Sequence, residues 1–450
     1  MPRTEATMNK RMNKRMNIIA LTWPIFIETL LRTAINTSDV FMLSSYSDHA
    51  VSAVGVISQI SFFLIVVSSM VSSGTGILIS QYNGAGRYDD VVHVGIASVF
   101  LAIIVGLFLS LFAVVGAEYL IPLYNLEAQV EQYATEYLLI SGAFTFSITI
   151  GIVFSTILRS HGYAKSPMVI NLIAGAINII GNYCALYQPF GLPVYGVAGV
   201  AISTVFSQCI GTLLFLVVLR KKEITLPLAQ YRDVPKAIYK KILTIGAMNS
   251  GEVLSYNMAQ MAIVFFIVQM GTASLTAFTY AQNIARISFA FALSIGQASQ
   301  IQTGYFVGKG WIDDITLKVQ KYFVVSFIAS LLITIMIYLF RFEIIDVFTQ
   351  DPEVILLVAS LITGSILLEA GRVFNLIFIS ALKATGDIKF PVQMGILSMW
   401  GIGVVMSYFL GIHWGYGVLG AWLAVAMDEW FRGLIMAYRW RAKKWIKYTL

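Results

Sequence analysis

Charged residues are scarce in this sequence: Asp, Glu, Lys and Arg make up 12% of its 450 residues, whereas hydrophobic residues make up 58%. A soluble domain usually carries about 25% charged residues, so the composition excludes an ordinary soluble globular protein. Cysteine is limited to Cys184 and Cys209, both within apolar stretches, which argues against a disulfide framework. The four histidines are scattered without metal-ligand spacing, so no metal centre or other cofactor is expected.

What the sequence has instead is a series of long apolar stretches, with a mean hydropathy of +0.78 over the chain. A helix needs roughly 20 mostly apolar residues to cross a bilayer. Lipid offers no partner to an unpaired backbone group, so each stretch should be a helix. We therefore predict an all-α polytopic membrane protein with 12 transmembrane helices, near residues 18–44, 51–82, 91–116, 132–159, 166–187, 194–219, 238–268, 273–306, 317–340, 354–382, 389–410 and 416–438.

Basic residues fall almost entirely on one side of these predicted spans. With the N-terminus inside, the inside segments hold all of the 30 Lys and Arg residues except Arg32, Arg286, Arg341 and Arg372. The positive-inside rule then predicts a multi-pass plasma-membrane protein with both termini in the cytoplasm. Topology signalling also accounts for the net charge of +7, so no nucleic-acid partner is expected.

The two halves of the chain repeat one another at a constant spacing, the one that separates Glu28 from Glu252. The other pairs matched at this spacing are Gly84 with Gly308, Gly86 with Gly310, Asp89 with Asp313, Asp90 with Asp314, Leu158 with Leu382, Gly162 with Gly386 and Pro167 with Pro391. An even number of spans per half makes the repeats parallel, as in transporters whose substrate site lies between two halves. The pattern predicts a first lobe at 1–219, a cytoplasmic linker at 220–237 and a second lobe with a basic tail at 238–450.

One segment resembles a nucleotide-binding motif and therefore bears on the source of energy for transport. Residues 304–310 approach a phosphate-binding loop, but the lysine is not followed by Ser or Thr, and the segment ends a helix instead of following a strand. Its repeat partner at 83–87 reads as the same tight turn. Without a nucleotide site, transport has to draw on an ion gradient, and no enzyme activity is expected.

Several short stretches occur in an ordered and partly duplicated arrangement. They are residues 22–24 and 39–42 in the first span, 81–86 after the second, 369–372 and 384–387 around the tenth, and 428–432 in the twelfth. Over nearly the whole chain this set resembles the bacterial branch of the multidrug and toxic compound extrusion (MATE) transporters. The resemblance implies two six-helix lobes in a V, export of cationic or amphipathic compounds, coupling to Na⁺ or H⁺, and a first-lobe cation site on spans 1 and 5.

The first span carries a stripe of polar residues. Taking Glu28 as 0°, Arg32, Asn36 and Asp39 lie at about 40°, 80° and 20° around a helix. We expect this stripe to face the interior of its lobe, because an ionisable group facing lipid costs at least ~2.5–3.5 kcal/mol. Pro24 removes one backbone hydrogen bond and should kink the helix. The structural alternative is that Arg32 simply pairs with Glu28 and Asp39.

The fifth span carries Asn171, Asn178 and Asn182 on one face. Asp39 and Asn182 share a depth, and one carboxylate with two amide oxygens suits a hard cation. With a proton instead, Asp39 would titrate. The resemblance places the coupling site on Asp39, Asn178 and Asn182, although many family members have Asp in place of Asn182. The second half lacks this set: the counterparts are Ile263, Ile402 and Met406.

The second half has its own polar residues. They are Asn249, Glu252 and Gln260 in span 7, Gln282, Asn283 and Arg286 in span 8, and Glu369, Arg372 and Asn375 in span 10. Because Arg372 falls roughly where some family members have a coupling aspartate, a network of Glu and Arg is expected here rather than a cation site. Asp428 and Arg432 are spaced for an ordinary helical ion pair.

These observations predict a secondary active multidrug exporter that works by alternating access. Its expected partners are small-molecule drugs or toxins, Na⁺ or H⁺, and the lipid bilayer, and the expected state is a monomer. The alternative is a flippase for lipid-linked intermediates on the same duplicated fold. A flippase would use a basic cavity, for which Arg32, Arg286 and Arg372 offer positive charge.

Overall fold

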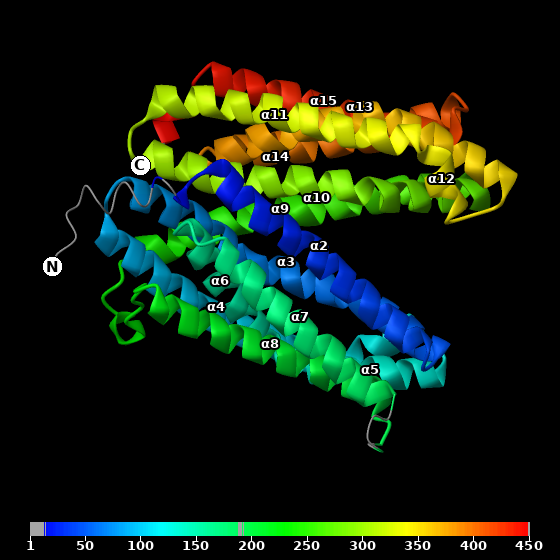
Figure 1. The fold of residues 1–450 in the computed structure, drawn as a ribbon, viewed down its shortest axis with the longest axis horizontal. Coiled ribbons are helices and arrows are strands. Elements are labelled where there is room, and N and C mark those ends of the chain that lie inside the picture. Colours follow the sequence, from blue (N-terminus) through cyan, green and yellow to red (C-terminus); the bar gives the residue numbers. More distant parts are fainter. Residues whose placement is uncertain (1–12, 14, 188–190, 192, 449–450) are drawn as a thin grey trace. The chain divides into compact units, whose positions relative to one another are not determined.

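The computed structural model describes residues 13, 15–187, 191 and 193–448, and every regular element in this part of the chain is a helix (Figure 1). The all-α fold class is therefore confirmed. The helices group into two compact units, Met1–Asn83 with Arg87–Ser250, and Gly84–Gly86 with Gly251–Leu450. The boundary between the units thus falls inside one long helix, and the lobe and linker limits at 219, 220–237 and 238 stay predictions.

The first unit is a bundle in which α7 packs against both α2 and α8, and α4 packs against α5 and α6. Figure 1 shows α7 and α8 running side by side. The bounds are α2 Ile18–Ser44, α3 Asp48–Gly84, α4 Tyr88–Tyr119, η1 Ile121–Tyr124, α5 Ala128–Ala143, α6 Thr145–Ser160, α7 Lys165–Leu186, α8 Gly196–Lys221, η3 Leu228–Gln230 and the first part of α9 Lys236–Gln269.

The second unit is built around α13, which packs against α10, α11 and α15. Its buried apolar side chains include Phe278 and Trp422, whose rings meet edge to face at 5.6 Å. The bounds are α10 Thr272–Gly308, α11 Ile312–Leu339, α12 Arg341–Asp346, α13 Pro352–Ala384, α14 Lys389–Ser398, η4 Met399–Val404, η5 Ser407–His413, α15 Gly417–Arg441 and η6 Ile446–Tyr448.

Helix boundaries repeat between the units at the spacing that the sequence predicts. The first residues of α3, α4 and α7 have the first residues of α10, α11 and α14 as their repeat counterparts. The turn glycines recur with them: Gly86 and Gly310 have φ of 70° and 73°, and Gly162 and Gly386 have φ of 79° and 92°. Glycine suits these turns because other residues adopt positive φ only with strain. The duplication is therefore one of backbone conformation as well as of sequence.

Nine helices of the described chain are long and apolar enough to cross a membrane, or ten if α5 and α6 form one broken span. The predicted spans at 273–306 and 416–438 are helices too, α10 and α15, but polar and charged residues interrupt their apolar runs. The predicted number of 12 spans is thus approximate, whereas the helical character of each predicted span is confirmed.

Two of the predicted spans are not regular α-helices. The span at 132–159 is α5 and α6, bent by 49° at Phe144. The span at 389–410 changes from the α-helix α14 to the π-helical segments η4 and η5. By contrast, α2 remains helical from Ile18 to Ser44 with Pro24 inside it.

Candidate functional site

Helices α2 and α7 of the first unit pack side by side with a constant offset in sequence. Glu28 contacts Asn171 and Asp39 contacts Asn182, and both pairs are separated by 143 residues in sequence. The two contacts lie about three helical turns apart, so the helices run parallel along this length. Gly175 lies between them, and a Cβ atom there would lie 2.1 Å from Cδ1 of Ile35. The small residue therefore lets α2 approach closely enough for both acid–amide pairs to form.

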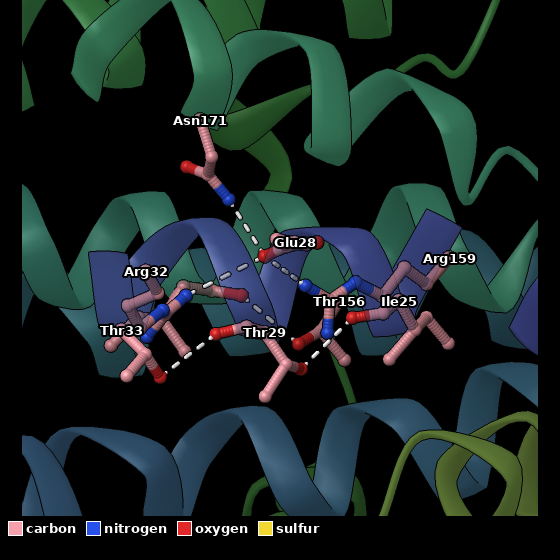
Figure 2. Close-up of polar contacts among 9 residues, drawn as sticks. Ile25, Glu28, Thr29, Arg32, Thr33, Thr156, Arg159 and Asn171 are labelled. Carbon is pink, nitrogen blue, oxygen red and sulfur yellow. Dashed lines mark hydrogen bonds and ion pairs between the residues drawn. The ribbon is translucent and has the colours of Figure 1, made fainter. Parts of the chain in front are cut away.

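At the first of these pairs, the Glu28 carboxylate collects donors from three directions (Figure 2). Its Oε1 atom accepts hydrogen bonds from Nη2 of Arg159 at 2.5 Å, from Nδ2 of Asn171 at 2.7 Å and from Nη2 of Arg32 at 3.5 Å. Glu28 is only 3% exposed. The expected pair with Arg32 is present, but Arg159, at the end of α6, is the closer partner.

At the second pair, Oδ1 of the half-buried Asp39 accepts a hydrogen bond from Nδ2 of Asn182 at 2.6 Å. Asn178, one helical turn away from Asn182, donates to the Thr204 hydroxyl on α8 at 3.2 Å. Both asparagines are buried, and their Oδ1 atoms have no hydrogen-bond partner in the described part of the chain. The structure thus brings the three predicted residues onto adjacent helices and leaves two amide oxygens free to accept.

The rest of the predicted stripe on α2 does not turn inward. The Arg32 side chain is 61% exposed, and Asn36 is exposed as well. Their offsets of about 40° and 80° from Glu28 carry them past the strip that α7 covers. The expectation that the whole stripe faces the interior of its lobe is therefore wrong for Arg32 and Asn36, and it holds for Glu28.

The second unit contains a copy of the Glu28 ion pair. Nζ of Lys383 donates to Oε2 of Glu252 at 2.5 Å. The two residues are 131 apart in sequence, as are Glu28 and Arg159. Both partners are therefore repeat counterparts of those in the first unit, and the duplication has preserved an ion pair as a pair. Glu252 is 6% exposed and is held at the end of α13 in the same way as Glu28 is held at the end of α6.

The copy lacks two of the three donors, because the repeat counterparts of Arg32 and Asn171 are Tyr256 and Gly395. Asn171 has Gly395 as its repeat counterpart, and a Cβ atom on Gly395 would lie 3.1 Å from Oε1 of Glu252. The backbone of α14 therefore lies beside the Glu252 carboxylate as α7 lies beside the Glu28 carboxylate, but α14 has no side-chain amide at this position. Glu28 receives three side-chain donors, whereas the described contacts give Glu252 only Lys383.

A separate buried network joins α13 to α15. Nη2 of Arg432 lies 2.6 Å from Oδ2 of Asp428 and 3.0 Å from Oε1 of Glu429, whose Oε2 atom accepts from Asn375 at 2.8 Å. The expected pair of Asp428 and Arg432 is therefore confirmed as part of a larger set. Arg372 pairs with Glu369 on the same helix and lies 5.0 Å from the Phe289 ring centroid.

Other predicted residues of the second half lie elsewhere. Gln282, Asn283 and Arg286 are exposed on α10. Asn283 donates to the backbone carbonyl of Thr279 on its own helix. The sequence suggests that Glu252 belongs to one network with Glu369 and Arg372. In the structure Glu252 pairs with Lys383 instead. The second half therefore has an ion pair and a buried network instead of one continuous polar cluster.

Sequence reasoning missed Arg159 and Lys383. Each lies at the end of a predicted span, where the positive-inside rule alone accounts for a basic residue. The signal was nevertheless available: the two are repeat counterparts, and each stands three positions before one of the repeated turn glycines, Gly162 and Gly386. A basic residue that recurs at the end of the corresponding helix in both halves indicates that each half also has an acidic partner for it.

These features define a multi-pass membrane transporter built from two duplicated helical halves. The MatE family model matches residues 24–184 and 250–409, and the chain belongs to this family, the multidrug and toxic compound extrusion transporters. The two matched segments fall in the two repeats. The sequence-based resemblance is thereby confirmed.

Relatives and solved structures agree with this assignment. The chain is 36% identical over 443 residues to the uncharacterized transporter YisQ of Bacillus subtilis (strain 168), covering 98% of this chain and 97% of that protein. It is 27% identical to the probable multidrug resistance protein NorM of Thermotoga maritima, covering 96% of this chain and 93% of that protein.

Among solved structures, a MATE crystal structure in the bent conformation matches with a TM-score of 0.88 at 20% identity, covering 96% of this chain and 95% of that one. A transporter of the MOP superfamily from Pyrococcus furiosus, described as having a binding pocket of reverse polarity that suggests a different function, matches with a TM-score of 0.84 at 20% identity, covering 96% of each chain. At this identity the likeness shows the fold.

Proposed function

We propose that this chain is a secondary active exporter that exchanges organic cations or amphipathic compounds for Na⁺ or H⁺, with Asp39, Asn178 and Asn182 as the coupling site. The observation that carries the proposal is the pairing of Asp39 with Asn182 beside two buried amide oxygens that have no hydrogen-bond partner in the described chain. Relatives named as multidrug resistance proteins support the substrate class.

The chemistry of this set suits a small cation. Oδ1 of Asp39 is engaged by Asn182, which leaves Oδ2 and the two asparagine Oδ1 atoms as acceptors of hard oxygen type. A proton on Asp39 would neutralise the carboxylate directly. In both cases the cation removes an uncompensated charge from the membrane interior, where it costs at least ~2.5–3.5 kcal/mol, and so favours one state of the transporter over the other.

Exchange follows if drug and coupling cation compete for one charge. An organic cation near Asp39 would stabilise the carboxylate in the drug-bound state, whereas Na⁺ or H⁺ would stabilise it in the return state. Because each ligand has a different affinity for the two states, each shifts the population in its own direction. Glu252 in the second unit is already paired with Lys383 and is the weaker candidate for this role.

Asp39→Asn tests the proposal. The change keeps the shape of the side chain but removes one charge movement per cycle, worth about 3.5 kcal/mol at ~150 mV, or a few hundredfold in accumulation. Vesicles with an imposed Na⁺ or H⁺ gradient should lose concentrative drug export in this variant while drug binding persists. Asp48→Asn, at the exposed start of α3, is the matched control. Concentrative export by Asp39→Asn at the parent level would refute the assignment.

The flippase alternative rests on exposed positive charge. Arg32 and Arg286 are both exposed on their units, and an anionic lipid carrier would need such groups. Under the exporter proposal, organic cations bind and are displaced by rising Na⁺ or H⁺ in the parent but not in Asp39→Asn. Preferential tight binding of a pyrophosphate-linked lipid, weakened by Arg32→Gln, would favour the flippase.

A further inference from the structure

A basic pocket lies at one end of the first unit, remote from Asp39. Its volume is about 430 Å³, and its lining includes Arg15, Ala20, Tyr163, Lys165, Ser166 and Lys222. These residues come from the start of α2 and the segment just before it, the turn between α6 and α7, the start of α7 and the residue that follows α8. Four helix ends therefore meet at this pocket, which places it at a membrane surface rather than in the middle of the bilayer.

Two of the positive groups, on Arg15 and Lys222, contact the same aromatic ring. The Arg15 guanidinium donates to the Tyr163 hydroxyl and lies 4.4 Å from the ring centroid, and Nζ of Lys222 lies 5.0 Å from the same centroid. Lys165 begins α7, whose first turn carries no acidic residue. The lining contributed by the described chain holds three basic side chains and no acid. Such a site is complementary to a compact anion with several oxygen acceptors.

The helix itself adds to this potential. The N-terminus of α7 points its partial positive charge at the pocket, and Ala164 at the cap position provides no side-chain hydrogen bond. Ser166 adds a hydroxyl to the lining. Gly162, with φ of 79°, lets the turn pass close to Arg15, because a Cβ atom there would lie 2.8 Å from Cβ of Arg15. The backbone is thus shaped to keep Arg15 at this position.

Exposed apolar side chains on α2 and α7 adjoin the pocket. Ile19 and Trp23 on α2 are 74% and 60% exposed, next to the pocket residue Ala20. Val169 on α7, one turn beyond Lys165, is 45% exposed. Tryptophan is enriched at the level of lipid headgroups. An anion that also carries acyl chains could place its charge in the pocket and its chains along these side chains, whereas a free phosphate would use only the pocket.

We propose that this pocket binds the phosphate of an anionic phospholipid such as phosphatidylglycerol. Basic pockets between membrane helices bind anionic lipid headgroups in this way, and 430 Å³ is within the size range of small-ligand sites. Topology signalling explains why basic residues lie on this side, but it requires neither a shared aromatic ring nor a cavity. The inference is independent of the coupling ion and of the exported substrate.

Lipid binding to the full-length protein in detergent tests the proposal. Titration calorimetry with short-chain phosphatidylglycerol should show binding, and phosphatidylcholine of the same chain length should bind at least tenfold more weakly. Lys165→Gln and Lys222→Gln should each weaken phosphatidylglycerol binding about fivefold. Lys165→Arg, which keeps the charge, should stay within about twofold of the parent.

Lys221→Gln is the matched control, because Lys221 is exposed on α8 next to Lys222 but is absent from the pocket lining. It should leave binding within about twofold of the parent. An equal loss in Lys221→Gln and Lys222→Gln would overturn the pocket in favour of diffuse attraction. Inorganic phosphate binding as tightly as phosphatidylglycerol would overturn the lipid assignment, and equal affinity for phosphatidylcholine would overturn the charge-based site. Thermal unfolding of each variant verifies that it is folded.

Discussion

The duplicated ion pair predicts that a partner removed from Glu252 in the second half can be replaced by the amide that Glu28 has in the first half. Lys383→Met removes the described partner of Glu252 and leaves a carboxylate that is 6% exposed. Gly395→Asn then places an amide where Asn171 stands in the first repeat. If the two halves are equivalent at this point, the new amide should donate to Glu252 as Asn171 donates to Glu28 at 2.7 Å.

The expected energies follow from the contacts. Removing one partner of a buried ion pair costs about 3–5 kcal/mol, so Lys383→Met should destabilise the second unit by an amount near the lower end, because its side chain is 15% exposed. A hydrogen bond to a charged group contributes about 1.5–3 kcal/mol. The Cβ atom of the new residue would lie 3.1 Å from Oε1 of Glu252, which requires a shift of a few tenths of an ångström. The double variant should therefore recover roughly half of the loss.

Thermal unfolding in detergent, followed by loss of monodisperse protein, measures the order of stability. We expect the parent and Gly395→Asn alone to lie close together, the Lys383→Met single variant lowest, and the double variant between them. Lys321→Met, at an exposed position on α11, controls for the loss of one positive charge. A double variant no more stable than Lys383→Met would refute the equivalence of the two carboxylate sites.

Three shorter predictions test other contacts. Gly175→Leu should lower stability by about 1–3 kcal/mol, because a side chain here meets Ile35; an unchanged unfolding temperature would contradict the close packing of α2 and α7. Asn182→Asp adds a second carboxylate beside Asp39 and should strengthen the dependence of drug export on Na⁺ or H⁺, as measured in vesicles; an unchanged ion dependence would argue against a coupling role. Burial lowers the pKa of His161 below its ordinary value, so its contribution to stability is present above about pH 6.5 and is lost as the pH falls through the lowered pKa. Unfolding temperatures should therefore drop more between about pH 7 and pH 5 in the parent than in His161→Gln, and equal drops would contradict this assignment.

Much of the fold could be predicted because the repeat is visible in the amino-acid sequence. The turn glycines Gly86 and Gly310 indicate where helices end. The length of the apolar stretches indicates that the helices cross a membrane. The bend at Phe144 was not predicted, although Ser141 and Gly142, a residue pair at which helices often kink, stand just before it. The exposure of Arg32 was also missed, because helical spacing gives the direction of a side chain but not the width of the strip that a neighbouring helix covers.

The site was predicted in part for a similar reason. Pairs within one helix, such as Glu369 with Arg372, follow from spacing alone, and the structure confirms them. Partners from distant helices do not: Arg159 meets Glu28 across 131 residues, and Asn375 meets Glu429 across 54. Only the register of packed helices determines such contacts, and that register depends on close approaches like the one at Gly175.

Comparison of the two repeats distinguishes the acids that both halves share from the pair proposed for coupling. An acid that has a basic partner at the same position in both halves, as Glu28 and Glu252 have, meets a requirement common to both bundles, namely fixing the first helix of each half to the end of its fourth span. A coupling site is under no such requirement, since one charge change per cycle is enough to link transport to a gradient. Asp39 and Asn182 lie on the same two helices as Glu28 and Asn171, about three turns further along, yet their counterparts Ile263 and Met406 are apolar. The second half folds without such a pair, so the common scaffold does not need it, and this is the reason we propose Asp39, rather than either glutamate, as the coupling acid.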